Sequence, residues 1–144
     1  MGRQGNGSVW VIPLPRFSVL FSQMSERNNV EFTGPERLRV YDLAQQLGVT
    51  ADHVVRNCHV RWHLADQLIR AVDSVILNIA EGAGNYSPGR KRLHYEIASG
   101  SAAECVAALT RILRQRPCQH AEDALQKANM ILVMLTRLIA RHRH

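Results

Sequence analysis

Basic side chains at the two ends of one expected helix are the residues of this chain best suited to binding another molecule. The chain carries 18 Lys and Arg against 12 Asp and Glu, and its formal net charge is +6. Residues 82–116 hold six basic and two acidic residues, and residues 117–144 hold four and two. Because the guanidinium fork matches phosphate oxygens, these clusters predict contacts with RNA or DNA phosphates. The candidate phosphate contacts are Arg90, Lys91, Arg92, Arg111, Arg114, Arg116, Arg137, Arg141 and Arg143.

A purely structural interpretation of the same residues stays open. Any one of these arginines also suits an ordinary solvated helix face, and arginines near a helix C-terminus complement the helix dipole. Basic clusters also keep a protein soluble without binding anything. The alternative function is therefore a structural or protein-binding oligomer whose basic residues only solubilise it.

Metal, cofactor and catalytic sites are not predicted. Cys58, His59 and His63 lie close together in sequence, but structural zinc takes four convergent ligands at a recognisable spacing. His120 and Cys118 likewise provide too few ligands for a metal ion. The glycines of residues 82–86 lack the preceding strand and the GK[ST] ending of a phosphate loop. Without a complete nucleophile, acid–base or metal constellation, we expect a protein that is not an enzyme.

The cysteines and the apolar residues near the N-terminus bear on location. Cys58, Cys105 and Cys118 are odd in number and show no paired framework, so we interpret them as small apolar residues in a reducing compartment. Residues 9–21 are fairly apolar, but prolines interrupt them and they are too short to span a bilayer. The expected location is the cytoplasm, with no membrane contact.

Four helices are expected to position these side chains. Pro35 suits the start of a helix that runs to about Asn57. A second, core helix ends near Gly82, and a third begins at Pro88 with Ser87 as its N-cap and runs to about Arg116. Pro117 breaks the chain, and a fourth helix begins near Gln119. The predicted fold is an all-α, antiparallel up-down-up-down four-helix bundle over residues 35–144.

Apolar stripes predict which residues form the core. The second helix places Ala65, Leu68, Ile69, Val72, Val75, Ile76 and Ile79 on one face. The third is expected to bury Leu93, Ile97, Ala98, Ser101, Cys105, Ala108, Leu109 and Ile112. Trp62 is expected to anchor the preceding turn. In the fourth helix Met130, Val133 and Met134 widen the stripe, which indicates a subunit contact.

Residues 1–34 have no helical stripe and are expected to form a poorly structured or extended segment. Met24-Ser25-Glu26 resembles a natural start, so we hypothesise that the first 23 residues play no part in the fold. The alternative is an arm whose Trp10, Val11, Ile12 and Leu14 pack on a neighbouring subunit.

Residues 43–56 also permit a helix-turn-helix, with a tight turn at Gly48 and a second helix that starts at Thr50. Ala51, Asp52 and His53 would then have to contact base edges, and they are poorly suited to that task. A single long helix, kinked or straight, is the favoured interpretation.

The central motifs are typical of one protein family. They are Gln67-Leu68-Ile69-Arg70-Ala71, Val75, Asn78-Ile79-Ala80-Glu81-Gly82, Glu96-Ile97-Ala98, Gly100-Ser101 and Glu104. This pattern resembles the four-helix bundle proteins encoded in ribosomal RNA intervening sequences, which include the accessory variability proteins of diversity-generating retroelements. The resemblance is specific over about residues 62–113. It implies a homopentamer with a basic surface associated with nucleic acid, and no known catalytic residues.

Together the charge and the resemblance predict a non-enzymatic adaptor that holds RNA or DNA, or a protein that processes it. Arg70, Asn78, Glu81 and Gly82 are expected to form a structural motif that fixes the corner between the second and third helices. Glu81 is expected to form an ion pair with either Arg70 or Arg92.

Overall fold

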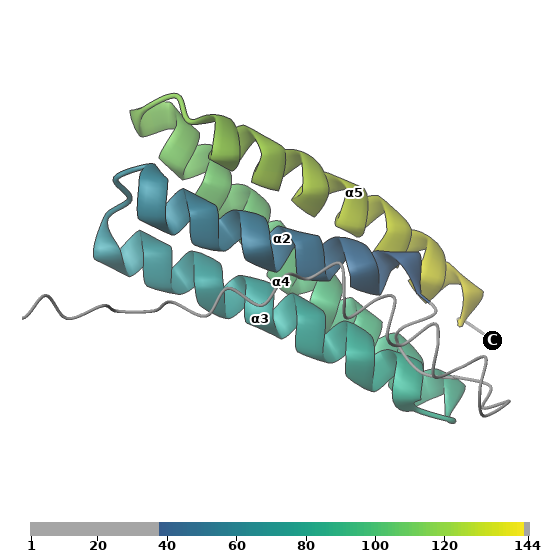
Figure 1. The fold of residues 1–144 in the computed structure, drawn as a ribbon. Helices are drawn as coiled ribbons and strands as arrows, with labels where there is room; N and C mark the ends of the chain where they lie inside the picture. Colours follow the sequence, from purple (N-terminus) through teal and green to yellow (C-terminus); the bar gives the residue numbers. More distant parts are fainter. Residues whose placement is uncertain (1–37, 143–144) are drawn as a thin grey trace, which may run out of the picture. The chain divides into compact units, whose positions relative to one another are not determined.

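The described part of the chain, residues 38–142 of a computed structural model, consists of four α-helices without a strand. They are α2 (Arg39–Asn57), α3 (Trp62–Gly84), α4 (Pro88–Gln115) and α5 (Gln119–Arg141), as Figure 1 shows. Within these residues, the prediction of four helices and an all-α fold is confirmed. The interpretations of residues 1–34, of Pro35 and of Arg143 fall outside the described residues.

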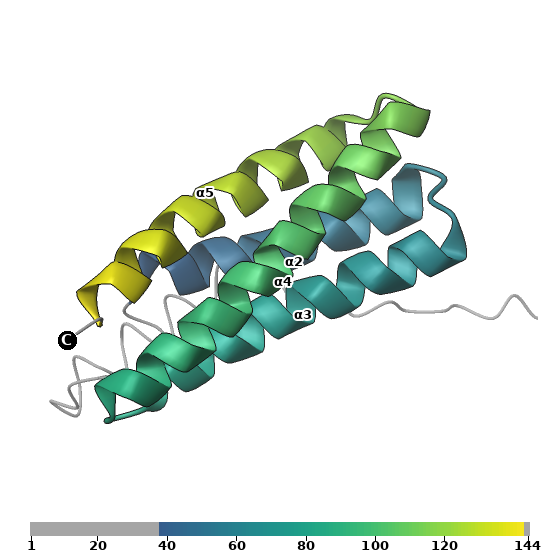
Figure 2. The same cartoon turned by 180° about the vertical axis from the view of Figure 1, so that it is seen from behind.

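Short linkers set the arrangement of the helices. Each helix packs against its neighbour in sequence, and α2 also packs against α5. Figures 1 and 2 show the helices lying lengthwise against one another, with consecutive linkers at alternate ends. Linkers 58–61 and 116–118 therefore share one end, here called the disulfide end (residues 52–66 and 111–123). Linker 85–87 lies at the other, here called the distal end (residues 81–95 and 137–142).

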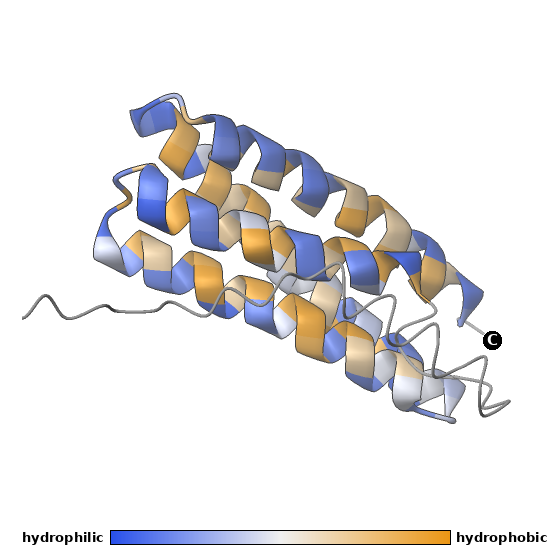
Figure 3. Ribbon diagram, viewed as in Figure 1, coloured by the Kyte–Doolittle hydropathy of each residue, from blue (hydrophilic) through white to orange (hydrophobic). Residues whose placement is uncertain are grey.

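The core is apolar throughout, and no charged or polar side chain of residues 38–142 is buried in it. Figure 3 shows apolar residues in stripes along each helix, separated by hydrophilic residues. The stripe predicted for α3 is confirmed, because Leu68, Val72, Val75 and Ile79 are buried. Each large apolar side chain buried this way contributes roughly 1.5–3 kcal/mol to folding. The largest fully buried ones include Leu47, Leu68, Ile79, Leu109, Ile131 and Leu135.

The first turns of α4 face differently from the prediction. The sequence predicts Leu93 and Ile97 in the core, yet they are 54% and 43% exposed. Tyr95 is buried in their place, at 2% exposure. Its ring lies against Gly82 of α3, where the missing Cβ leaves room for it. The apolar stripe predicted from sequence is therefore rotated in this part of the helix.

Gly48 lies within α2, which is continuous from residue 39 to residue 57. The Thr50 hydroxyl donates to the Gln46 carbonyl oxygen at 2.8 Å, as expected inside a helix. The helix-turn-helix alternative is wrong, since the turn that it requires is absent from α2. A Cβ at Gly48 would lie 3.3 Å from Ile76 Cδ1 of α3, so glycine here permits close helix packing.

The start and the end of α4 follow the prediction. Ser87 is the N-cap residue and Pro88 the first helical residue, and the helix ends at Gln115, before Pro117. The Ser87 side chain makes no capping hydrogen bond, however.

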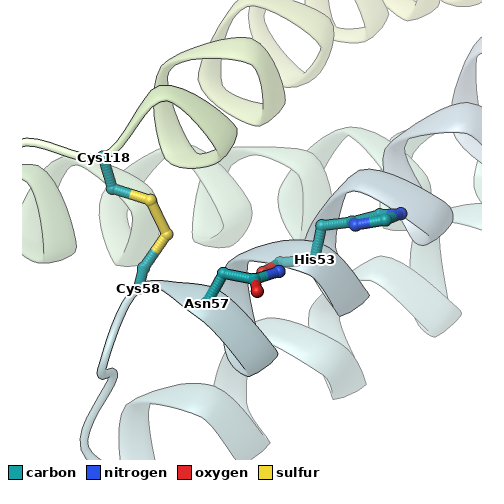
Figure 4. Close-up of a disulfide and its surroundings, with 4 residues drawn as sticks. All are labelled: His53, Asn57, Cys58 and Cys118. Atoms are coloured by element: carbon teal, nitrogen blue, oxygen red, sulfur yellow. A yellow bond between two sulfur atoms is a disulfide. The ribbon is translucent and has the colours of Figure 1, made fainter.

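A disulfide joins Cys58 to Cys118, and the prediction that all three cysteines are unpaired is wrong. Cys58 follows α2 and Cys118 precedes α5, and their Cα atoms lie 5.9 Å apart, within the usual range for a disulfide. Figure 4 shows the bond between the two linkers. Only Cys105 matches the prediction. It is buried, and desolvation together with the nearby Glu104 carboxylate raises the pKa of its thiol to about 12.

Candidate nucleic-acid interface

The structure divides the predicted phosphate contacts between the two ends of the molecule. Arg90, Lys91 and Arg92 lie in the first turn or so of α4, and Arg111 and Arg114 lie near its end. The helix has 28 residues, so at 1.5 Å per residue it is about 42 Å long. A single phosphate group therefore cannot contact both clusters of one chain.

The distal end combines the start of α4 with the end of α5. The rings of Tyr95 and His142 lie 5.9 Å apart between centroids, which brings Arg137 and Arg141 to the same end as Arg90. Two residues of this cluster already have partners. The Arg92 guanidinium pairs with Glu96 at 2.7 Å, and the Lys91 ammonium donates to the Ala83 carbonyl oxygen at 3.4 Å. This end is therefore only partly available to phosphate.

The disulfide end is the better candidate interface. Arg111, Arg114 and Arg116 are all exposed there. The Cys58–Cys118 bond brings the last turn of α2 and the linker after it to the same end, which adds the exposed Arg56 and Arg61. Sequence reasoning missed these two arginines because they lie about fifty residues before the others. Their proximity follows from the fold and left no signal in local spacing.

Trp62 lies at the disulfide end with most of its surface exposed, at 81%. The prediction that it anchors the turn is wrong. Leu64, at 8% exposure, is the residue of this first turn of α3 that enters the core. The indole contacts the His63 ring edge-on, with centroids 5.7 Å apart and planes at 89°.

A polar network along the seam of α3 and α4 contains two of the motif residues. His94 Nδ1 of α4 lies 2.9 Å from Glu81 Oε2 and 3.2 Å from Asn78 Oδ1 of α3. The Asn78 amide also donates to the Ser74 carbonyl oxygen at 2.9 Å. The Ser74 and Ser101 hydroxyls complete the network, with their oxygens 2.8 Å apart. These contacts support a structural role for the motif at the corner between the two helices.

The ion pairs expected for Glu81 are wrong in both versions. Arg70 pairs with Asp66 at 2.7 Å within α3, and Arg92 pairs within α4. Each arginine pairs with a carboxylate four residues away on the same helix, because residues at that spacing are neighbours on the helix surface. Glu81 instead reaches the half-buried His94.

Replacement of Asn78 by alanine should lower the free energy of unfolding by roughly 1 kcal/mol, because the amide links Ser74 to His94 in a partly buried seam. Urea denaturation measures the change. Asn129→Ala, at an exposed position inside α5, is the matched control and should raise stability by up to ~0.7 kcal/mol, because it gains the helix propensity of alanine without losing a seam contact. Equal stability of the two variants would contradict a structural role for the network.

The outer face of α5 carries the surplus apolar residues that the sequence predicted. Met130 and Val133 are exposed, and with Leu125, Met134 and Arg137 they line a shallow depression on this helix. The exposure agrees with the sequence analysis. The subunit contact inferred from it stays a prediction.

Other kinds of site find little support in the residues that the structure describes. Across residues 38–142, no group of three or more His, Cys, Asp or Glu side chains is placed to hold a metal ion. Figure 4 shows His53 extending away from the disulfide sulfurs. No helix within that range is both long enough and apolar enough to cross a membrane.

For residues 38–142, these observations define the class as all-α proteins of four packed helices. Within that class, the family model described as 23S rRNA-intervening sequence protein matches residues 36–137. The chain belongs to this family, and the family resemblance seen in its motifs is confirmed. No curated protein matches the chain. The wider link to accessory variability proteins of retroelements stays a prediction.

Proposed function

We propose that this protein is a non-enzymatic adaptor that binds the phosphate backbone of RNA or DNA through its basic ends. The observation that carries the proposal is the disulfide end, where exposed arginines from two stretches of the chain, residues 56–61 and 111–116, lie at the same end of the helices. Arginine suits phosphate through charge and through its planar fork of donors. Membership of a family named for a 23S rRNA intervening sequence favours an RNA partner.

Assembly would strengthen such contacts. We propose an antiparallel up-down-up-down bundle that forms a homopentamer, with the exposed apolar face of α5 around Met130 and Val133 as a source of subunit contacts. A ring repeats each basic end five times, so weak phosphate contacts act together. The adaptor would hold nucleic acid, or a protein that processes it, in the cytoplasm.

The adaptor should bind nucleic acid in a salt-dependent and largely sequence-independent way. Light scattering should show a mass gain with mixed-sequence RNA or duplex DNA at low salt and its loss at high salt. Replacing Arg111, Arg114 and Arg116 together by alanine should flatten the slope of log affinity against log salt by about 0.7–0.9 for each phosphate that the variant no longer neutralises.

Lys127→Ala is the matched control, since it removes a positive charge from the middle of α5, outside both basic ends. It should leave the slope unchanged. A parent protein that gains no mass at low salt would contradict the adaptor. It would favour the structural alternative, which the internal partners of Lys91 and Arg92 also suit.

A further inference from the structure

Trp62 is unusual because a large aromatic side chain is left in solvent beside an apolar core. Tryptophan is on average a highly buried residue, and its ring offers a large apolar area. At 81% exposure the Trp62 indole contributes little to the core. Its role in the fold is therefore small, and its free surface is available to a ligand.

The backbone that carries this indole is held on both sides. Four residues before it, Cys58 is fixed to Cys118 by the disulfide. After it, the amides of Leu64 and Ala65 both donate to the Arg61 carbonyl oxygen at 3.0 Å, which closes the first turn of α3. His63 meets the indole perpendicularly and so covers at most one ring face. The structure presents a flat apolar face from a fixed support.

The disulfide end carries five arginines and four carboxylates, and arginines lie on both sides of the disulfide. Arg61 precedes Trp62 directly, and Arg114 and Arg116 reach the same end through the linker that carries Cys118. The nearby Asp66 carboxylate is already paired with Arg70. The distal end also shows an exposed aromatic residue, Tyr86 at 98%, but Lys91 and Arg92 beside it are engaged within the protein.

We infer that Trp62 is a base-stacking residue and that the disulfide end binds single-stranded RNA or DNA. This inference rests on the proposed function and deepens it by naming the form of the nucleic acid. An unpaired base would stack on the open indole face, while Arg61, Arg114 and Arg116 contact the flanking phosphates. A duplex hides its base faces and would engage only the arginines. An acidic protein segment would likewise contact the arginines and would not stack on the indole.

The experiment follows Trp62 by its own fluorescence. The chain has two tryptophans, so Trp10→Phe leaves Trp62 as the single emitter. This protein is titrated with unstructured single-stranded RNA and DNA 12-mers, with a duplex of equal charge, and with poly-glutamate. Single strands should quench the emission strongly, because a stacked base contacts the ring directly. The RNA and DNA arms show whether the ribose hydroxyl matters.

Trp62→Ala should weaken single-strand binding by roughly 5- to 150-fold, which corresponds to ~1–3 kcal/mol for one stacked base, and should leave duplex binding unchanged. Trp62→Phe should recover part of the affinity. Tyr86→Ala is the matched control, because it removes an equally exposed aromatic ring from the other end. Circular dichroism should show the parent helix content in all three variants.

Two results would overturn the inference but leave the proposed function standing. One is an unchanged affinity of Trp62→Ala for single strands. The other is quenching by poly-glutamate as strong as that by single strands. A parent protein that binds neither single strands nor duplex would remove the proposed function together with the inference.

Discussion

Loss of the Cys58–Cys118 disulfide should lower the melting temperature by roughly 10 °C or more, the largest effect that we expect from any single change. The bond joins residues separated by 60 positions in sequence. Chain-entropy arguments assign about 4 kcal/mol to a closed loop of that length, because the cross-link restricts the unfolded chain. Melting curves with and without a thiol reductant measure the effect.

The control for this prediction is the double variant Cys58→Ala/Cys118→Ala. It should melt near the temperature of the reduced parent and should not respond to reductant. Thiol titration of the unfolded, unreduced parent should find one free thiol per chain, from Cys105. Three free thiols, or a melting temperature that ignores reductant, would show that the two cysteines are not bonded.

The disulfide also connects stability with the candidate interface. It fixes the linkers that carry Arg61 and Trp62 on one side and Arg116 on the other. Reduction would free the two linkers from each other while the apolar core of the helices remains. The arrangement of the arginines at this end therefore depends on the bond more than the helices do.

The sequence predicted well what depends on local pattern. The four helices, the stripe of α3 and the break at Pro117 follow from periodicity and from proline, which act within a few residues. Membership of the family followed from short motifs in α3 and α4. These features require no knowledge of which helix packs where.

Predictions failed where the answer depended on contacts between helices. The pairing of Cys58 with Cys118 and the addition of Arg56 and Arg61 to the interface follow from two linkers that meet at one end. The exposure of Leu93 follows from the burial of Tyr95, which Gly82 of another helix permits. The candidate site was therefore only half predicted, since its residues were grouped by distance along the chain.

Gly82 is the motif residue whose replacement should disturb the fold most. A Cβ at this position would lie 2.6 and 2.8 Å from two ring carbons of Tyr95, closer than atoms can approach. The ring is buried, so it cannot turn into solvent. Overpacking of this kind lowers the free energy of unfolding by up to ~3 kcal/mol. The higher helix propensity of alanine offsets about 1 kcal/mol of that loss. Gly82→Ala should therefore lower the free energy of unfolding by roughly 2 kcal/mol.

Gly100→Ala separates this clash from the general effect of removing a glycine. Gly100 lies inside α4 with open space around its Cα, so the same substitution there should raise stability by up to ~1 kcal/mol. Urea denaturation of both variants and of Gly82→Ala/Tyr95→Leu tests the cause. The smaller leucine should accept the new methyl group, so the double variant should be more stable than the two separate losses predict. If Gly82→Ala were as stable as Gly100→Ala, the glycine would have no packing role, and the contact of Tyr95 with α3 would not explain the motif.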